Sequence, residues 1–433
     1  MKRNLLLISL LVVSTCIDAQ VYSLEQCIDS ALQNNISLLQ QKKQYESYRL
    51  SYIQQKHNIT PSVSGYVGQS WSFGRATGVD NITRSQNMSN TNFSLSANLL
   101  LFDGLGMKFR IDEARANMQS SAAQTEQLES DLRIDIIGMY LQALLKKQLL
   151  LLADSQLVNT KHKIEQQQQK IDEGKLAEGE IYSLQSQYAK EEYSKIQSES
   201  DVQLALLDLA QAMNIIYTPD FDIVEPKDLS EFSSVLPSAE EVYKVAVANR
   251  PEIRSAQMLL EAQQIALKGA KSAYSPTLSA SANIGTGYYH QYGAENAAFG
   301  KQLGDNFQTN VGLTLQIPIY DRMQTPNSVK RQKISIQNQE LQIVLIKQNL
   351  RKEIDQAYYN ALAAHAEQTS SQKAEQSAKE AYRYMEQKFE AGRASVYEYY
   401  DAKNTYRQAE SQFLQAQYNY IFKLQILEYL KGR

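Results

Sequence analysis

The sequence is poor in the residues that interrupt helices or cross-link small folds. It holds 2 cysteines, 8 prolines and 18 glycines among 433 residues. Because Cys16 lies in a candidate export signal, only Cys27 remains after cleavage, and an internal disulfide is excluded. The formal net charge is −3, without the basic excess that a nucleic-acid partner attracts, so no nucleic acid is expected.

Motifs for catalysis are missing as well. The four histidines, at positions 57, 162, 290 and 365, lie far apart without the spacing of metal ligands. We find no phosphate-binding loop, no nucleophile elbow and no paired histidine and acid. The sequence therefore predicts a protein that is not an enzyme and that needs no cofactor or metal.

The amino terminus has the pattern of a secretory signal. Lys2 and Arg3 precede a short apolar stretch from Leu5 to Val13, and residues 17–19 precede a plausible cut before Gln20. An alternative is cleavage before a lipidated Cys16, which the bulky residue Thr15 disfavours. Residues 1–19 are therefore expected to be a signal peptide, and no later apolar run is long enough to cross a bilayer as a helix.

What the sequence does contain is an internal duplication. Residues 20–216 and 238–433 carry the same order of predicted elements, and the proline-containing segment 217–237 links them. Each repeat reads as two helices, a strand, a loop, a strand and a long helical hairpin. The matching positions are Asn34-Asn35 and Asn249-Arg250, Pro61 and Pro276, Phe102-Asp103 and Tyr320-Asp321, Gly174 and Gly392, Glu180 and Glu398, and Tyr182 and Tyr400.

Four segments alternate apolar and polar side chains with a period of two. They predict strands at about 62–72, 92–102, 277–290 and 307–319, joined pairwise by polar loops at 72–90 and 292–306. One apolar face and one hydroxyl or amide face suit a strand between lipid and water. A water-exposed antiparallel sheet shows the same alternation, but its apolar face needs a cover, and the helices are expected to pack on one another.

The helices are expected to be far longer than those of globular proteins. Residues 105–171 hold no proline, which predicts a helix of roughly 67 residues or ~100 Å. Its counterpart runs over 328–390, the returning helices over 176–215 and 394–430, and shorter helices over 24–59 and 238–273. The helical hairpins thus cover about 105–215 and 325–430, a pattern typical of coiled coils.

Four strands are too few to close a membrane barrel alone. An open sheet leaves two unpaired edges in lipid, at several kcal/mol for each unsatisfied backbone group. The sequence therefore predicts an oligomer that closes the sheet, with cyclic symmetry as the simplest route.

The whole mature chain resembles the TolC-like outer membrane efflux family. The resemblance is carried by the duplication, by Leu24-Glu25-Gln26-Cys27-Ile28 with Ala31-Leu32-Gln33-Asn34-Asn35, by Leu101-Phe102-Asp103-Gly104 with Pro318-Ile319-Tyr320-Asp321, and by the turns at Gly174 and Gly392. It implies a mainly α-helical fold with membrane β-strands. In that fold a homotrimer forms a shared 12-stranded β-barrel, which continues as a long periplasmic α-helical barrel.

The resemblance also implies partners and a location. Members of the family conduct substrates passively out of the cell through the outer membrane. They dock onto a periplasmic membrane-fusion adaptor and an inner-membrane RND or ABC transporter, in tripartite efflux pumps or type I secretion systems. Contact with outer membrane lipid and a periplasmic extension are expected. A dedicated protein-secretion duct would share this architecture, and the cargo is not readable from the sequence.

Two places in each repeat are predicted to be structural joints or tips. Asp103 and Asp321, each behind an aromatic residue (Phe102 and Tyr320), stand where a strand gives way to a helix and are expected to accept hydrogen bonds from the first helical N–H groups. The turns at Gly174-Lys175 and Gly392-Arg393 are expected to end the helices. The resemblance assigns them to the adaptor-facing tip.

The resemblance further implies a charged constriction near the second turn. Glu398 and Asp401 lie three residues apart on one helix face, and Glu180 occupies the equivalent place in the first repeat. Repeated by symmetry, such acids form rings that favour cations. The alternative is that acids in the first turns of a helix only complement its dipole.

The sequence departs from the family's gate pattern. A tyrosine and an arginine bind the tip closed in the best-known members, whereas Phe389 and Ala394 stand here. Either Arg393 and Lys175 supply the closing bonds from neighbouring positions, or aromatic packing by Phe389, Tyr397, Tyr399 and Tyr400 closes the tip instead. The alternative for the whole chain is an exported coiled-coil or adhesin-like trimer without a transport role, for which two matching amphipathic hairpins would be unnecessary.

Overall fold

The structure is a computed structural model that describes residues 21–77, 81–85, 87–174, 178–225 and 236–432. The predicted signal peptide, with Cys16, lies outside the described residues. The chain divides into two compact units. The helical unit consists of Met1–Gln41, Thr125–Arg250 and Lys347–Arg433, and the sheet unit consists of Lys42–Gln124 and Pro251–Ile346.

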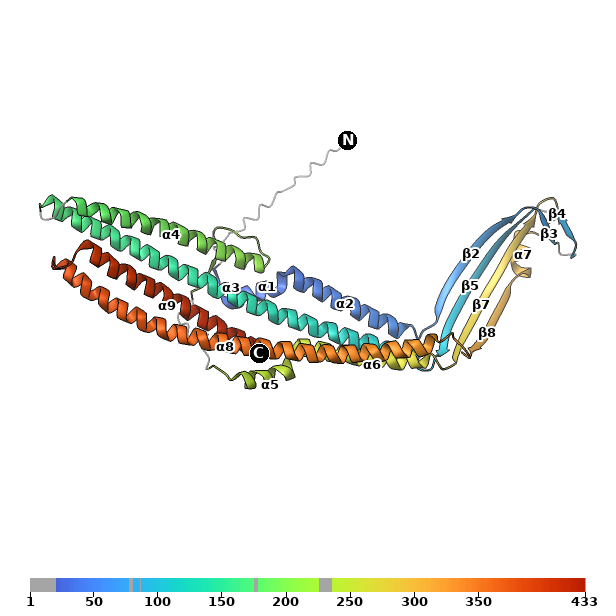
Figure 1. Ribbon diagram of the computed structural model, residues 1–433. Coiled ribbons are helices and arrows are strands. Elements are labelled where there is room, and N and C mark those ends of the chain that lie inside the picture. The colour runs from blue at the N-terminus through green and yellow to red at the C-terminus, as the bar shows by residue number, and fades with distance from the viewer. Residues whose placement is uncertain (1–20, 78–80, 86, 175–177, 226–235, 433) are drawn as a thin grey trace, which may run out of the picture. The chain divides into compact units, whose positions relative to one another are not determined.

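The helical unit is built from four long helical segments and shorter pieces. The long segments come from α3 (Gly106–Asp172), α4 (Gly179–Ala212), α8 (Gln324–Glu390) and α9 (Val396–Leu430), which lie side by side (Figure 1). The shorter pieces are α1 (Leu24–Asn34), α5 (Ala239–Asn249) and the parallel pair β1 (Val21–Tyr22) and β6 (Asp222–Ile223).

Both α3 and α8 hold 67 residues, the length expected for the first of them. Helix α8 begins at Gln324, four residues before the expected start, because Pro326 lies in its first turn, where a proline removes no intrahelical hydrogen bond.

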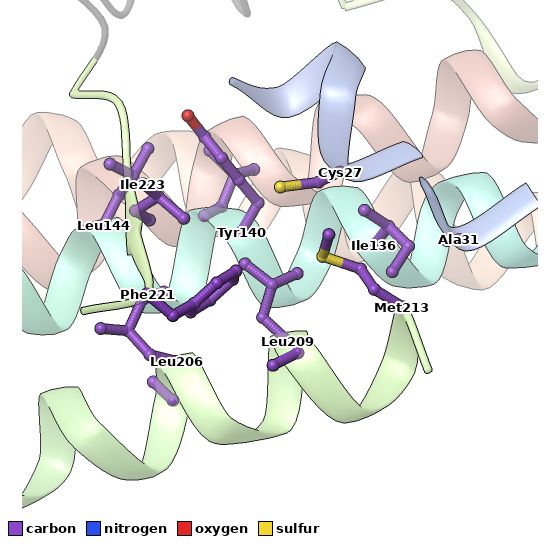
Figure 2. Packing of buried hydrophobic residues seen from close by; sticks show 14 of the residues in the cluster. Cys27, Ala31, Ile136, Tyr140, Leu144, Leu206, Leu209, Met213, Phe221 and Ile223 are labelled. Carbon is purple, nitrogen blue, oxygen red and sulfur yellow. The ribbon is translucent and has the colours of Figure 1, made fainter. Parts of the chain in front are cut away.

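The largest core of the helical unit lies where α1 meets α3 and α4. Figure 2 shows Cys27 and Ala31 of α1 facing Ile136 and Tyr140 of α3, with Leu209 of α4 on the other side. Phe221 and Ile223 close the cluster from the segment that follows α4. The buried thiol of Cys27 has a pKa raised to about 12 by desolvation, so it is an inert packing group.

One stretch of α3 is long and apolar enough to cross a membrane by length and composition alone, contrary to the expectation from the sequence. One such stretch is weak evidence of a membrane-spanning helix, because core helices of soluble proteins can be equally long and apolar. Ile136, Tyr140 and Leu144 of α3 are buried in the core of the helical unit, and 33% of the apolar stretch is buried.

The sheet unit contains one four-stranded antiparallel sheet, in the order β2-β5-β7-β8 (Figure 1). Its strands are β2 (Ser62–Ser72), β5 (Met88–Phe102), β7 (Thr277–Gln291) and β8 (Gln308–Gln316). Helices α2 (Ile36–His57) and α6 (Pro251–Ser272) precede β2 and β7. The fourth strand was expected to reach residue 319 but ends at Gln316, two residues before Pro318, which has no N–H for a ladder.

The loops between paired strands contain structure that the sequence analysis did not anticipate. Residues 72–90 include a small hairpin of β3 (Arg75–Thr77) and β4 (Thr83–Ser85), and β5 begins four residues before the expected strand. Residues 292–306 include the short helix α7 (Phe299–Asp305), which packs on β7. Short polar elements have no periodicity that a sequence pattern reveals.

The register places most apolar residues of the four strands on one face. Val67 is opposite Phe93, which is opposite Thr286, and Ala280 is opposite Leu313. Directly opposed residues of an antiparallel pair share a face. The apolar face therefore includes Val63, Val67, Trp71, Phe93, Leu95, Ala280, Ala282, Ile284, Val311, Leu313 and Leu315. The opposite face carries mainly serine, asparagine and glycine, together with Tyr66, Leu100 and Tyr289. Leu313 is 70% exposed and Trp71 is 59% exposed.

Each strand-to-helix joint turns in the same way. Asp103 accepts a hydrogen bond from the Met107 N–H at 3.1 Å and pairs with Arg110 at 2.8 Å, and Asp321 accepts one from the Thr325 N–H at 2.7 Å. The two residues after each aspartate have positive φ. In the first repeat the first of them is Gly104, whose missing Cβ leaves room for Ser275, at 2.5 Å from where that atom would lie.

Candidate functional site at the turn end of the long helices

Two tight turns end the helices that carry the predicted tip residues. Gly174 and Gly392 have φ of +74° and +69°, the left-handed conformation that glycine adopts without strain. The Gly392 N–H donates to Phe389 O at 3.0 Å, and the Arg393 N–H donates to Lys388 O at 2.8 Å. Arg393 is exposed, and Lys175 lies outside the described residues. Contact of either turn with an adaptor stays a prediction.

The first acid of the predicted constriction is part of the start of α9. Ser395 and Glu398 form a capping box, in which the Glu398 carboxylate accepts hydrogen bonds from the Ser395 N–H and hydroxyl, both at 2.8 Å. These bonds lower the pKa of Glu398. Glu398 is exposed, so it has a structural role and remains available to solvent.

The other predicted constriction acids have no shared cluster within the described side chains. Asp401 is exposed on α9, one turn beyond Glu398. Glu180 lies in the first turn of α4, and its side chain is outside what the structure describes. A ring of acids requires further copies of the chain and stays a prediction.

Three of the four predicted gate aromatics pack together. Tyr399 is 1% exposed, its ring stacks on Phe389 with 4.7 Å between centroids, and it meets Tyr400 edge-on at 5.0 Å. Burial raises the pKa of both tyrosines. Tyr397 is 80% exposed and is not part of this cluster within one copy of the chain, so its place in the gate stays a prediction.

This packing joins all four long helices. The cluster contains Tyr399 and Tyr400 of α9, Leu184 of α4, Ile164 of α3 and Tyr382 of α8. The Tyr382 and Tyr399 hydroxyls lie 3.0 Å apart. Within one copy of the chain, the aromatic cluster therefore fastens the first helical hairpin to the second.

A buried ion network beside this cluster was missed by sequence reasoning. Glu191 of α4 contacts Arg407 of α9, and the Lys403 ammonium lies 4.0 Å from the same carboxylate oxygen. Lys403 also donates to the Thr160 hydroxyl of α3 at 2.9 Å. Glu191 and Lys403 are almost fully buried. The one signal in the sequence is that the other repeat has uncharged residues at the positions equivalent to all three charges: Ala409, Gln185 and Ala189.

The lysine of this network predicts a specific pH dependence of stability. Burial, reinforced by Arg407, lowers the pKa of Lys403 from 10.5 to about 8. Between pH 8 and 10.5 this lysine is more fully protonated in the unfolded chain than in the folded chain. Its contribution to the free energy of unfolding therefore rises with pH in this range. Lys403→Met is expected to remove that rise, measured by denaturant unfolding at several pH values. Lys190→Met, on the exposed side of α4, is the control. Parallel curves for wild type and Lys403→Met would contradict this prediction.

The described residues contain no group of three or more histidine, cysteine, aspartate or glutamate side chains that could hold a metal ion. The arrangement at the turn end thus consists of helix caps, an aromatic cluster and a buried ion network. These groups hold the hairpin of α3 and α4 against the hairpin of α8 and α9 within one copy of the chain.

A family model matches most of the chain. The profile described as "Outer membrane efflux protein" matches residues 27–214 and 242–433, one segment in each repeat. No curated protein matches this sequence.

Solved structures share the fold. The chain is similar to CusC, whose structures concern folding and transmembrane channel formation, with 16% identity, a TM-score of 0.79, and 95% of this chain and 92% of that chain covered. It is also similar to the Campylobacter jejuni CmeC outer membrane channel (16% identity, TM-score 0.76, 94% and 85% covered). A third similar structure is the open state of the Neisseria gonorrhoeae MtrE outer membrane channel (18%, 0.75, 94% and 88%). The predicted TolC-like fold is confirmed, and the chain belongs to the outer membrane efflux protein family.

Proposed function

We propose that the chain is one subunit of a homotrimeric exit duct in the outer membrane. The observation that carries the proposal is the sheet of the sheet unit, which has one exposed apolar face and ends in two edge strands, β2 and β8. Because the four strands alternate in direction, β8 of one copy beside β2 of the next forms another antiparallel pair. Repeating this contact closes a barrel and removes both edges.

The stagger of the strands supports closure. Ser62 at one end of β2 is level with Ser281 of β7, whereas Gln316 at the same end of β8 is level with Thr277. At the other end, Ser72 is level with Gln291 and Gln308 with Gly285. From β2 to β8 the strand ends are thus displaced by about five residues, at ~3.3 Å each, over three strand spacings of ~4.7 Å. This corresponds to a strand tilt of roughly 50°, close to the tilt of about 35–45° that is typical of closed barrels.

The height of the apolar face suits a bilayer. Phe102 is opposite Leu278 at the joint end, because a register shift after Leu100 turns its side chain to the apolar face. At the other end Tyr288 lies on the same face. The eleven residues from Leu278 to Tyr288 span about 33 Å along the strand. At that tilt this is about 21 Å across the membrane, near the ~25 Å height of the apolar band that lies between the aromatic girdles of membrane barrels.

The number of copies and the partners follow from the family resemblance. Three copies give the 12-stranded barrel, and the resemblance implies a periplasmic α-helical barrel built from the long helices. Gly174, Lys175, Gly392 and Arg393 then face a membrane-fusion adaptor coupled to an inner-membrane RND or ABC transporter. The duct serves a tripartite efflux pump or a type I secretion system and supplies no energy itself.

Single-channel recording in planar bilayers tests the proposal. The purified protein is expected to give discrete conductance steps that prefer cations, because rings of Glu398 and Asp401 concentrate them. Glu398→Gln combined with Asp401→Asn should lower the ratio of cation to anion permeability without destabilising α9, since glutamine also completes a capping box. Glu192→Gln, an exposed acid on α4, is the matched control. Inserted protein without conductance would refute the duct, and unchanged selectivity would refute the acid rings.

A further inference from the structure

Strand β7 extends beyond its partner β8. The two strands pair from Thr277 with Gln316 to Gly285 with Gln308, whereas β5 pairs with β7 as far as Gln291. Residues 286–291 of β7 therefore have no strand partner in β8 on the edge that faces away from β5. An unpaired edge at this place would be costly in a membrane protein and would attract foreign strands.

Side-chain amides bind this edge in place of a strand. Gln302 of α7 is 3% exposed, and its amide accepts a hydrogen bond from the Tyr289 N–H and donates one to Tyr289 O, both at 3.0 Å. Two further side-chain amides bind alternate residues of the same strand. The Asn296 amide accepts a hydrogen bond from the Gln291 N–H at 2.8 Å and donates one to Gln291 O at 2.9 Å. The Asn306 amide donates to Gly287 O at 2.7 Å. The segment 296–306 thus continues the ladder that β8 leaves, and we call it the strap.

The strap fixes an aromatic residue at the outer end of the sheet, the end opposite the strand-to-helix joints. Phe307 follows the strap directly and precedes β8. It is 59% exposed, and the alternation of β8 puts it on the apolar face with Leu313. At the other edge of the sheet, Phe73 follows β2, is 76% exposed, and alternates onto the same face as Trp71.

We propose that Phe307 of one copy packs on Phe73 of the next copy. This contact, the aromatic lock, stabilises the outer end of the seam, the strand pair that β8 of one copy forms with β2 of the next. This inference rests on the proposed closure of the sheet by pairing β8 with β2. The alignment that sets Gln308 opposite Ser72 pairs all nine residues of β8 and keeps both apolar faces on one side. It places Leu313 opposite Val67, and Phe307 opposite Phe73.

Disulfide trapping in the intact membrane protein tests this alignment. Directly opposed residues have Cα atoms about 4.5–5.5 Å apart, within the range that a disulfide spans. Cys27 is buried and inert, so it contributes no background. Phe73→Cys with Phe307→Cys is expected to give covalent dimers and trimers on oxidation, as is Val67→Cys with Leu313→Cys at mid-seam. Val63→Cys with Phe307→Cys, which joins opposite ends of the two strands, should give none.

The outcomes separate this inference from the proposed function. Linking at mid-seam without linking of positions 73 and 307 overturns the aromatic lock and leaves the barrel standing. Linking of neither pair overturns barrel closure and the lock with it. Gln302→Leu, added to each pair, is expected to lower linking at positions 73 and 307 and to spare the mid-seam pair. An unchanged yield at both places would show that the strap does not position Phe307.

Discussion

Replacing Glu191 with alanine is expected to lower the free energy of unfolding of the helical unit by about 3–5 kcal/mol, because it leaves two buried cations without a counter-charge. Arg407 contacts this carboxylate directly and Lys403 lies 4.0 Å from it, and Glu191 and Lys403 are almost fully buried. Denaturant unfolding followed by helical circular dichroism measures the loss. Glu192→Ala, next in the chain but exposed, should change it by no more than about 0.5 kcal/mol.

A second variant separates the charges from the packing. Replacing the whole network with apolar residues of similar volume, as in Glu191→Leu with Lys403→Met and Arg407→Met, is expected to recover most of the stability. Equal stability of Glu191→Ala and Glu192→Ala would mean that the network is not closed in solution. Because these residues join α4 to α9, the single variant should also loosen the turn end and raise the open probability of the channel.

Leu313→Arg is expected to prevent most of the protein from assembling in the outer membrane. Leu313 lies in the middle of β8 on the apolar face. An arginine near the bilayer midplane costs about 2–4 kcal/mol in each copy, and symmetry repeats this cost in every subunit. The measurement is the fraction of the protein recovered from outer membranes as an oligomer.

The neighbouring residue supplies the control for this substitution. Thr314 is opposite Ser279 and lies on the polar face, which the proposal turns toward the water-filled lumen. Thr314→Arg should therefore assemble like the wild type. If both arginine variants assembled equally well, the apolar face would not be in contact with lipid.

Features with a repeating physical cause could be read from the sequence. The alternation of side chains identified all four strands of the sheet, and the lack of helix breakers identified the two helices of 67 residues. Asp103 and Asp321 could be placed because a helix start needs an acceptor for its first N–H groups, and both accept such a bond.

Features that depend on tertiary contact were missed. Glu191, Lys403 and Arg407 are ordinary surface residues by composition, and only the packing of the long helices leaves their side chains 11% exposed or less. The amides of Asn296, Gln302 and Asn306 stand in a polar segment without periodicity. Their role appears only when the length of β7 is compared with that of β8.

The oligomeric state of the protein extracted from outer membranes tests the central claim most directly, since one chain supplies four strands and cannot close a barrel. Native mass spectrometry of the detergent-extracted protein should give the mass of three chains. A single chain that stays dissolved in water without detergent would contradict the account.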